Sequence, residues 1–233
     1  MNEEMKKDYA DSIRFWNEVF KPEAESEAEK QEPKEIAPSE KLYQACVSLG
    51  NAEGLLDYGC GDGWASVIAA LSGCASVHAV DVNENAPKAA AKNAEAYGVS
   101  GRVKAECVSP DWIAGEESAR YDAVFCSNVL DVVPREVSER IVREIARVLK
   151  PGGRAVIGLN HFLLPREDPE RGMTVKENDH IYVNGILRLF SRTDEEWAAA
   201  FSPYFTVEQL QHFAWPQEQT ERRRLFFLTK KRR

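Results

Sequence analysis

From residue 41 onward, apolar runs of strand length alternate with longer segments whose apolar residues recur at helical spacing. The strand-like runs occupy residues 54–58, 76–81, 103–108, 121–127 and 153–159. The segments with helical period occupy residues 40–49, 64–71, 85–97 and 135–149. Because this alternation is the pattern of repeated βα units, it predicts an α/β fold with a doubly wound, parallel sheet.

The alternation of strand-like and helical segments ends after Leu159. A loop that contains prolines leads to a strand expected within residues 180–190. Thr193 and Glu196 then form a capping-box pattern, which predicts a helix through Phe201. Two last apolar runs, 205–213 and 224–229, are expected to pair antiparallel and to close the sheet. The predicted fold is therefore a mostly parallel, seven-stranded sheet whose last strand is antiparallel.

The first 40 residues have a different character. Tyr9, Ile13 and Trp16 recur at roughly helical intervals, which predicts an amphipathic helix. Residues 22–40 are rich in Glu and contain three prolines, as is typical of a linker or a lid. Docking onto the main domain and covering a substrate both explain the helix. We therefore divide the chain into residues 1–40 and a domain at 41–233.

Charge and cysteine usage exclude several function classes. The formal net charge of -8 disfavours a general nucleic-acid binder, which needs clustered Lys and Arg. The five cysteines form no CxxC pair, so we expect reduced thiols and no metal site. The N-terminal residues lack the apolar segment of a secretory signal, and no run is long enough for a membrane helix, which favours the cytoplasm.

A glycine-rich loop is the strongest local signal. The strand at 54–58 runs into Gly59, Gly61 and Gly63 and then into a helix, so a ligand can approach the backbone closely. A dinucleotide fingerprint would place a third glycine where the chain has Trp64. A P-loop would need a lysine after the glycines, and none lies between Lys41 and Lys88.

Asp81 ends the second predicted strand. In an open parallel sheet its carboxylate would lie beside the glycine loop, where it can accept hydrogen bonds from both hydroxyls of a ribose. A helix-capping role is the alternative for this residue. The combination of the loop and Asp81 favours a nucleoside ligand over a pyrophosphate or a nucleoside triphosphate.

Three motifs follow one another in the chain. They are the segment 57–63 (Asp-Tyr-Gly-Cys-Gly-Asp-Gly), the pair Val80-Asp81, and the segment 147–153 (Arg-Val-Leu-Lys-Pro-Gly-Gly). With these motifs the chain resembles the class I S-adenosylmethionine-dependent methyltransferases of the small-molecule type, over roughly residues 41–160. The resemblance implies a Rossmann-like fold, S-adenosyl-L-methionine as cofactor with S-adenosyl-L-homocysteine as product, and in-line transfer of a methyl group to a small molecule.

The resemblance implies roles for individual residues of the glycine-rich loop. Cofactor contacts would come from Asp57, Tyr58, Gly59, Cys60 and Gly61. In these enzymes the two glycines would lie against the methionine part of the cofactor, and Asp57 would organise its amino group.

Further cofactor contacts are implied at the ends of the next strands. Asp81 and Val82 would hold the ribose. Asp111 would accept a hydrogen bond from the adenine amino group, and the backbone amide of Trp112 would donate one to the ring. Asn128 would be the first polar contact near the sulfonium.

An acceptor that is a hydroxyl or an ammonium group must lose a proton, and a positioned side chain contributes ~10²–10⁴-fold when it removes one. His161, just after the fifth strand, is our first candidate for this base, and Asp131 and His180 follow. Ordinary polar roles remain open for each of them.

The acceptor itself should meet the parts that depart from the common core, the N-terminal helix and the insertion at 161–190. Trp16, Phe162, Tyr182 and Arg188 are the candidate contacts there, although packing also explains them. Protein methylation, aminopropyl transfer and a non-catalytic S-adenosylmethionine-binding module remain as alternatives. The partner expected first is a small molecule, with no membrane or nucleic acid, and the sequence carries no signal for an oligomeric state.

Overall fold

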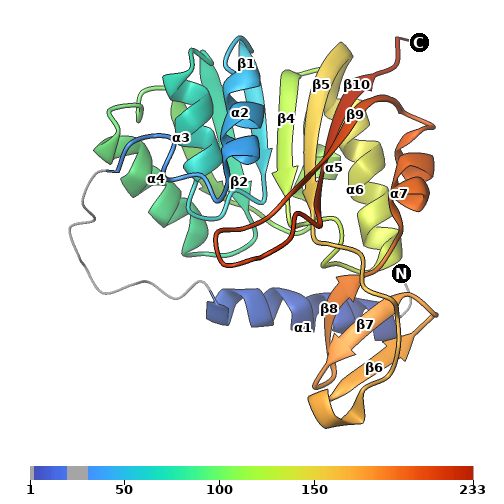
Figure 1. Ribbon diagram of the computed structural model, residues 1–233. Coiled ribbons are helices and arrows are strands. Elements are labelled where there is room, and N and C mark those ends of the chain that lie inside the picture. The colour runs from blue at the N-terminus through green and yellow to red at the C-terminus, as the bar shows by residue number, and fades with distance from the viewer. Residues whose placement is uncertain (1–2, 20–30, 233) are drawn as a thin grey trace.

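The computed structural model describes residues 3–19 and 31–232 and shows a sheet between two helical layers (Figure 1). The sheet has the strand order β3-β2-β1-β4-β5-β10-β9. Its strands are β1 (Gly54–Tyr58), β2 (Ser76–Asp81), β3 (Val103–Cys107), β4 (Tyr121–Ser127), β5 (Leu149–Leu159), β9 (Phe205–Phe213) and β10 (Arg223–Lys230). The first five are parallel, and β10 runs antiparallel to both β5 and β9. The predicted doubly wound sheet is confirmed.

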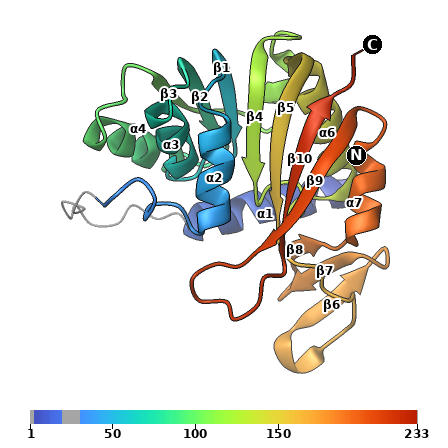
Figure 2. The ribbon, with the colours of Figure 1, turned by 45° about the horizontal axis from the view of Figure 1, so that its top comes forward.

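Helices cover both faces of this sheet, as Figure 2 shows. They are α2 (Glu40–Ser48), α3 (Trp64–Leu71), α4 (Ala86–Ala96), α5 (Trp112–Gly115), α6 (Arg135–Val148) and α7 (Asp194–Phe201). Neighbouring residues of β1 belong to opposite cores: Leu55 packs in the cluster with α2, α3 and α4, and Leu56 packs in the cluster with α6 and α7. Every helix of the described residues is too short or too polar to cross a membrane.

Strand β5 begins earlier than the predicted run at 153–159, directly after α6. The helix ends at Val148 and β5 begins at Leu149, which pairs with Tyr121, so no separate turn lies at residues 151–153. The pairing shifts register between Tyr121 and Ala123. Pro151 lacks an N–H group and Gly152 has a φ of +78°, so this pair forms an irregularity within the strand.

The segment expected to hold one strand at 180–190 forms a small antiparallel sheet instead. Its strands are β6 (Met173–Lys176), β7 (His180–Val183) and β8 (Ile186–Phe190). Asn184 and Gly185 both have positive φ, as a two-residue hairpin turn requires. The Asn-Gly pair therefore splits the predicted strand into a hairpin. The predicted capping box of α7 is confirmed, with Thr193 and Glu196 in their expected roles.

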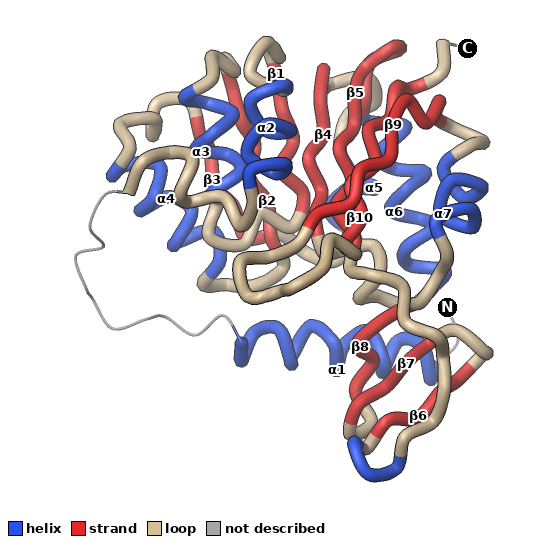
Figure 3. The backbone as a smooth tube through the Cα atoms, viewed as in Figure 1, coloured by secondary structure: helices blue, strands red, loops and turns tan. Residues whose placement is uncertain are grey.

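The N-terminal helix α1 (Glu3–Val19) lies along the edge of the sheet where the parallel strands end, and it packs against β8 (Figure 3). Ser12 Oγ donates a hydrogen bond to the carbonyl of Val132 at 3.0 Å. Asn83 Nδ2 donates one to the carbonyl of Trp16 at 3.2 Å. Much of the acidic linker expected after this helix falls outside the described residues.

The surroundings of Gly63 show how tightly the glycine loop is packed. Its φ is +79°, and a Cβ atom there would lie 2.5 Å from the Cβ of Ala90. Gly98 also has a positive φ, of +72°, but its surroundings are open to 4 Å. We expect Gly98→Ala to lower the free energy of unfolding by about 1–2 kcal/mol through backbone strain alone. Gly63→Ala should cost ~1–3 kcal/mol more through overpacking, measured by urea unfolding. Equal losses would mean that α3 and α4 do not meet this closely.

Candidate functional site

A cavity of about 420 Å³ opens at the edge of the sheet where the parallel strands end. Its walls come from α1, from the start of α2, from the loops after β1, β2, β4 and β5, and from the loop between β9 and β10. Eight of the residues expected to bind cofactor line it: Asp57, Tyr58, Gly59, Cys60, Gly61, Asp81, Val82 and Asn128. The acceptor candidate Trp16 lines it as well.

The glycine loop rests on the end of β2. The backbone N–H groups of Gly59 and Cys60 donate to the carbonyl of Val80 at 2.8 Å and 3.0 Å. The N–H of Gly61 donates to Asp81 Oδ2 at 3.0 Å, and the N–H of Asn83 donates to Asp81 Oδ1 at 2.9 Å. Asp81 therefore joins the loop to its own strand end, and its half-buried carboxylate borders the cavity.

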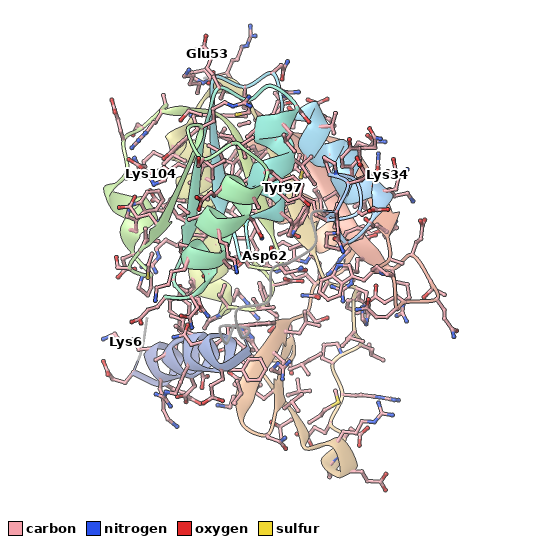
Figure 4. All side chains as sticks on the ribbon, turned by 90° about the vertical axis from the view of Figure 1, so that its left-hand side faces the viewer. Lys6, Lys34, Glu53, Asp62, Tyr97 and Lys104 are labelled. Atoms are coloured by element: carbon pink, nitrogen blue, oxygen red, sulfur yellow. The ribbon has the colours of Figure 1, made fainter. Side chains whose placement is uncertain are left out.

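Asp57 is the most buried carboxylate of the cavity wall. Its side chain accepts a hydrogen bond of 2.6 Å from Ser66 Oγ. Burial raises the pKa of Asp57 to about 7; the nearby charges of Asp81 and Asp62 add to the rise, and the Ser66 hydrogen bond opposes it. Asp62 lies on the loop between β1 and α3, in the region of the domain that faces α1 (Figure 4). Three carboxylates thus lie around one cavity.

Asn128 follows β4 in a left-handed backbone conformation, with a φ of +56°. Its N–H donates to the carbonyl of Gly158 at 2.9 Å, which fixes the turn. Its side-chain Oδ1 is buried and has no hydrogen-bond partner among the described residues. A strained residue with an unpaired acceptor at a cavity wall is typical of a ligand contact.

The expected adenine contacts do not line the cavity. The side chain of Asp111 forms an ion pair with Arg140 at 2.8 Å. The backbone N–H of Trp112 already donates to the carbonyl of Ser109 at 3.0 Å, and the Trp112 ring lies edge-on to His78. Val108, at the end of β3, is the residue of this region that borders the cavity.

The three candidate bases also lie away from the cavity wall. Asp131 is fully buried and accepts a hydrogen bond of 2.6 Å from the N–H of Asn160. Burial, followed by the charges of nearby arginines, lowers the pKa of His161. The ring of His180 accepts from the N–H of Arg135 at 3.1 Å, so its other nitrogen donates to Asp179 at 2.7 Å. Both ring nitrogens of His180 are therefore engaged in structural hydrogen bonds.

Two of the acceptor candidates attach α1 to the small sheet. The hydroxyl of Tyr182 donates to Asp8 Oδ2 at 2.6 Å. The guanidinium of Arg188 lies 3.9 Å from the centre of the Phe15 ring. Phe162 borders a separate, more open hollow beside α7. None of these three side chains reaches the cavity.

Several cavity residues were not among the sequence-based candidates. They include Tyr9, Ser12 and Ile13 of α1, Ile36 and Leu42 beside α2, Trp64 of α3, Phe125 of β4, Asn160 after β5, and Trp215 of the β9–β10 loop. Trp64 carried one signal, because it interrupts the dinucleotide fingerprint. Tyr9 and Ile13 carried only the helical spacing of the N-terminal segment. The remaining residues carried no motif, because only the fold brings them to the glycine loop.

Comparisons with known proteins match part of the chain to methyltransferases. Residues 55–153 match the model of a family described as "Methyltransferase domain". The "Ubiquinone biosynthesis O-methyltransferase" of Leptothrix cholodnii is 36% identical over 108 residues, which are 46% of this chain and 44% of that protein. The "Ribosomal RNA small subunit methyltransferase C" of Chromohalobacter salexigens is 36% identical over 144 residues, 57% of this chain and 40% of that protein. The chain spans less than half the length of these curated relatives.

A solved structure extends the likeness to nearly the whole chain. It is the 1,6-didemethyltoxoflavin-N1-methyltransferase of Burkholderia thailandensis, with bound 1,6-didemethyltoxoflavin and S-adenosylhomocysteine. Its TM-score is 0.67 at 18% identity, over 97% of this chain and 87% of that chain, which establishes a common fold. Residues 55–153 of this protein therefore match the methyltransferase domain family, and the chain shares the fold of this solved methyltransferase.

Proposed function

We propose that the protein binds S-adenosyl-L-methionine and transfers its methyl group to a small molecule. The observation that carries the proposal is the arrangement of Asp57 and Asp81 on either side of the glycine loop, with both carboxylates at one cavity. A sulfonium and an ammonium group are cations, and the cavity wall among the described residues contains three Asp but no Lys, Arg or His. The charge of the site therefore suits this cofactor.

The residues present fit the cofactor part by part. Asp81 offers free acceptor positions for ribose hydroxyls, since each carboxylate oxygen uses one on a backbone N–H. Asp57 suits the amino group. The first turn of α3, which borders the cavity at Trp64 and Ala65, provides the positive end of a helix for the carboxylate. Asn128 and Val108 complete the wall near the ends of β4 and β3.

The bound cofactor would supply an activated methyl group: the acceptor's lone pair bonds to the methyl carbon, the carbon–sulfur bond breaks, and its electron pair remains on sulfur. The protein's part is positioning, because a near in-line arrangement removes much of the entropic barrier. Since no His, Lys or Arg of the described residues lines the cavity, the acceptor's proton would pass to water or to one of the three carboxylates.

We further propose that α1 covers the site and that residues 161–190 hold it there. Tyr9, Ser12 and Trp16 of this helix line the cavity. The hydrogen bond from Tyr182 to Asp8 and the contact of Arg188 with Phe15 attach the helix to the small sheet. Because α1 closes this side of the cavity, the site favours an acceptor of small-molecule size over a folded protein or an RNA.

Transfer of label tests the proposed function. Cell extract separated into small-molecule, protein and RNA fractions would be incubated with the protein and with S-adenosylmethionine carrying a deuterated methyl group. We expect labelled product in the small-molecule fraction and equimolar S-adenosylhomocysteine, measured by mass spectrometry. Label confined to protein or ribosomal RNA would contradict the proposed acceptor class, and formation of neither product would contradict methyl transfer.

Aminopropyl transfer is a second candidate that one observation favours. No cationic side chain of the described residues lines the cavity to pair with a carboxylate, and the decarboxylated form of the cofactor lacks that group. Parallel calorimetric titrations with S-adenosylmethionine and its decarboxylated form separate the two functions. Methyl transfer predicts tighter binding of the intact cofactor.

The pKa of Asp57 predicts a pH dependence of ligand binding. Below pH 7 the carboxyl is mostly protonated and offers no negative charge to an ammonium group. We therefore expect S-adenosylhomocysteine to bind about ten times more tightly at pH 8 than at pH 6. Asp57→Asn should bind weakly at both values, and Ser66→Ala should move the transition to higher pH, because its hydrogen bond lowers the Asp57 pKa. Wild-type affinity that is constant over this range would refute the role of Asp57.

A further inference from the structure

The loop between β9 and β10 is drawn in dark red in Figure 2. It carries one aromatic side chain that lines the cavity, Trp215. The Arg223 guanidinium lies over the indole, 3.5 Å from the ring centre. Arg223 itself is buried, and it pairs with Glu218 through Nη2 at 2.8 Å and through Nε at 2.9 Å. Glu218 also accepts a hydrogen bond of 3.0 Å from the N–H of Trp215. These hydrogen bonds, the ion pair and the cation–π contact hold the indole at the cavity wall.

The same arginine orients a polar group of the cavity. Arg223 Nη1 donates to Asn160 Oδ1 at 2.6 Å. This bond occupies the carbonyl oxygen of the Asn160 amide, and its NH₂ group hydrogen-bonds to Asp131, so one N–H of that group is left to offer. Asn160 lines the cavity at the end of β5, and Asn128 lines it at the end of β4. One amide thus offers a donor, and the unpaired Oδ1 of the other offers an acceptor.

The rest of this part of the cavity is apolar. Trp64 and Phe125 meet edge to face with ring centres 5.5 Å apart. Leu42 and Ile36 belong to the same packed cluster, as does Trp215. We call these five residues (Ile36, Leu42, Trp64, Phe125 and Trp215) the aromatic wall. The carboxylates of the cavity lie near the ends of β1 (Asp57) and β2 (Asp81) and on the loop after β1 (Asp62).

We infer that the aromatic wall and the two asparagines bind the methyl acceptor, and that the acceptor is a small, planar, uncharged aromatic or heteroaromatic molecule. Its O–H or N–H group donates to Asn128 Oδ1, and its ring lies against Trp215. This inference rests on the proposed methyl transfer. An anionic acceptor would enter a cavity with three carboxylates and no cationic side chain among the described lining residues. A cavity near the lower end of the ~300–1,000 Å³ usual for small ligands leaves little space beside a nucleoside.

Arg223 acts in this inference as a positioning residue. It reaches the acceptor only through Trp215 and Asn160, whose orientations it fixes. A lysine at position 223 would keep the charge but lose the planar stack and the paired hydrogen bonds. Arg222, its exposed neighbour in the chain, does not line the cavity and serves as the matched control.

Four probe molecules of one ring system test the acceptor class: naphthol, decahydronaphthol, naphthoate and methoxynaphthalene, all substituted at the same position. Each would be titrated calorimetrically into the full chain saturated with S-adenosylhomocysteine. We expect naphthol to bind about ten times more tightly than decahydronaphthol, because the saturated rings cannot stack. Naphthoate should be weaker by a similar factor, since its charge is repelled. Methoxynaphthalene should be about fivefold weaker than naphthol, since it lacks the donor for Asn128.

Substitutions then test whether Trp215 and Arg223 cause these differences in affinity. Trp215→Ala should weaken naphthol binding about tenfold, and Trp215→Phe should restore most of it. Arg223→Lys should weaken it about fivefold, whereas Arg222→Lys should leave it unchanged. In all four variants the affinity for S-adenosylhomocysteine should stay within about twofold of wild type, which shows that the protein is folded and separates the acceptor from the cofactor.

The inference is overturned if S-adenosylhomocysteine binds but naphthol does not. It is also overturned if decahydronaphthol or naphthoate binds as tightly as naphthol, or if Trp215→Ala leaves naphthol affinity unchanged. Failure of the folded wild type to bind S-adenosylhomocysteine is a different result, because it removes the proposed methyl transfer itself.

Discussion

Replacing Asp81 by alanine is expected to weaken the binding of S-adenosylhomocysteine by about 10²–10⁴-fold, because hydrogen bonds to a charged group contribute ~1.5–3 kcal/mol each and a ribose offers two hydroxyls. The substitution also removes the acceptor for the N–H of Gly61, which lies 3.0 Å from the Asp81 carboxylate. The glycine loop should therefore lose both a ligand contact and its attachment to β2. Isothermal titration calorimetry at pH 8 measures the effect.

Asp122→Ala is the matched control for this variant. Asp122 also accepts a backbone hydrogen bond across the sheet, from the N–H of Gly54 at 2.9 Å, but it lies at the opposite end of the strands and does not line the cavity. Its loss should change affinity by less than about twofold, as is usual for independent sites. An Asp81→Ala protein that is folded and binds as tightly as wild type would show that the nucleoside does not lie at this strand end.

Asp131→Ala is expected to lower the melting temperature by roughly 5–10 °C, since each buried donor left without its acceptor costs ~1–3 kcal/mol and each kcal/mol corresponds to ~2–4 °C in a chain of this size. The Asp131 carboxylate accepts the N–H of Asn160 and faces the electrostatic field of the buried Arg224. Without it, the buried Arg224 would keep one ion pair among the described residues, with Asp194 at 3.6 Å. Differential scanning calorimetry measures the change.

The same variant separates a structural role of Asp131 from a catalytic one. If Asp131 is structural, Asp131→Ala should bind S-adenosylhomocysteine and retain turnover at temperatures well below its melting point. Asp122→Ala, which removes the partly exposed partner of Lys150, should cost only ~1 kcal/mol. A catalytic Asp131 would give the reverse pattern, with an unchanged melting temperature and lost turnover.

The sheet could be predicted from the sequence because its strands are buried and bounded by clear helix signals. The structure differs from the prediction where the backbone conformation of a few residues determined the strand bounds more strongly than the apolar pattern did. Pro151 and Gly152 look like a turn, yet Leu149 already pairs with Tyr121 and the strand absorbs both residues. The run at 180–190 has enough apolar residues for one strand, but Asn184-Gly185 folds it back on itself.

One part of the candidate site could likewise be predicted from the sequence, and the other part could not. Its nucleoside side is built from consecutive strand ends, so Asp57 and Asp81 could be placed from their positions in the chain. The acceptor side is assembled from distant segments: Trp215 follows the last helix, and Tyr9 precedes the first strand. His161 is next to Asn160 in the chain, but only Asn160 lines the cavity. Proximity in the chain therefore identified the right strand end but the wrong side chain.

Calorimetric titration of the folded wild-type protein with S-adenosylhomocysteine at pH 8 tests the central claim most directly. The cavity, the glycine loop and the two carboxylates predict one binding site per chain, with a dissociation constant between about 1 µM and 1 mM, the range in which enzymes usually bind their substrates. A cooperatively folded protein that releases no binding heat, and whose melting temperature stays unchanged at millimolar ligand, would contradict it.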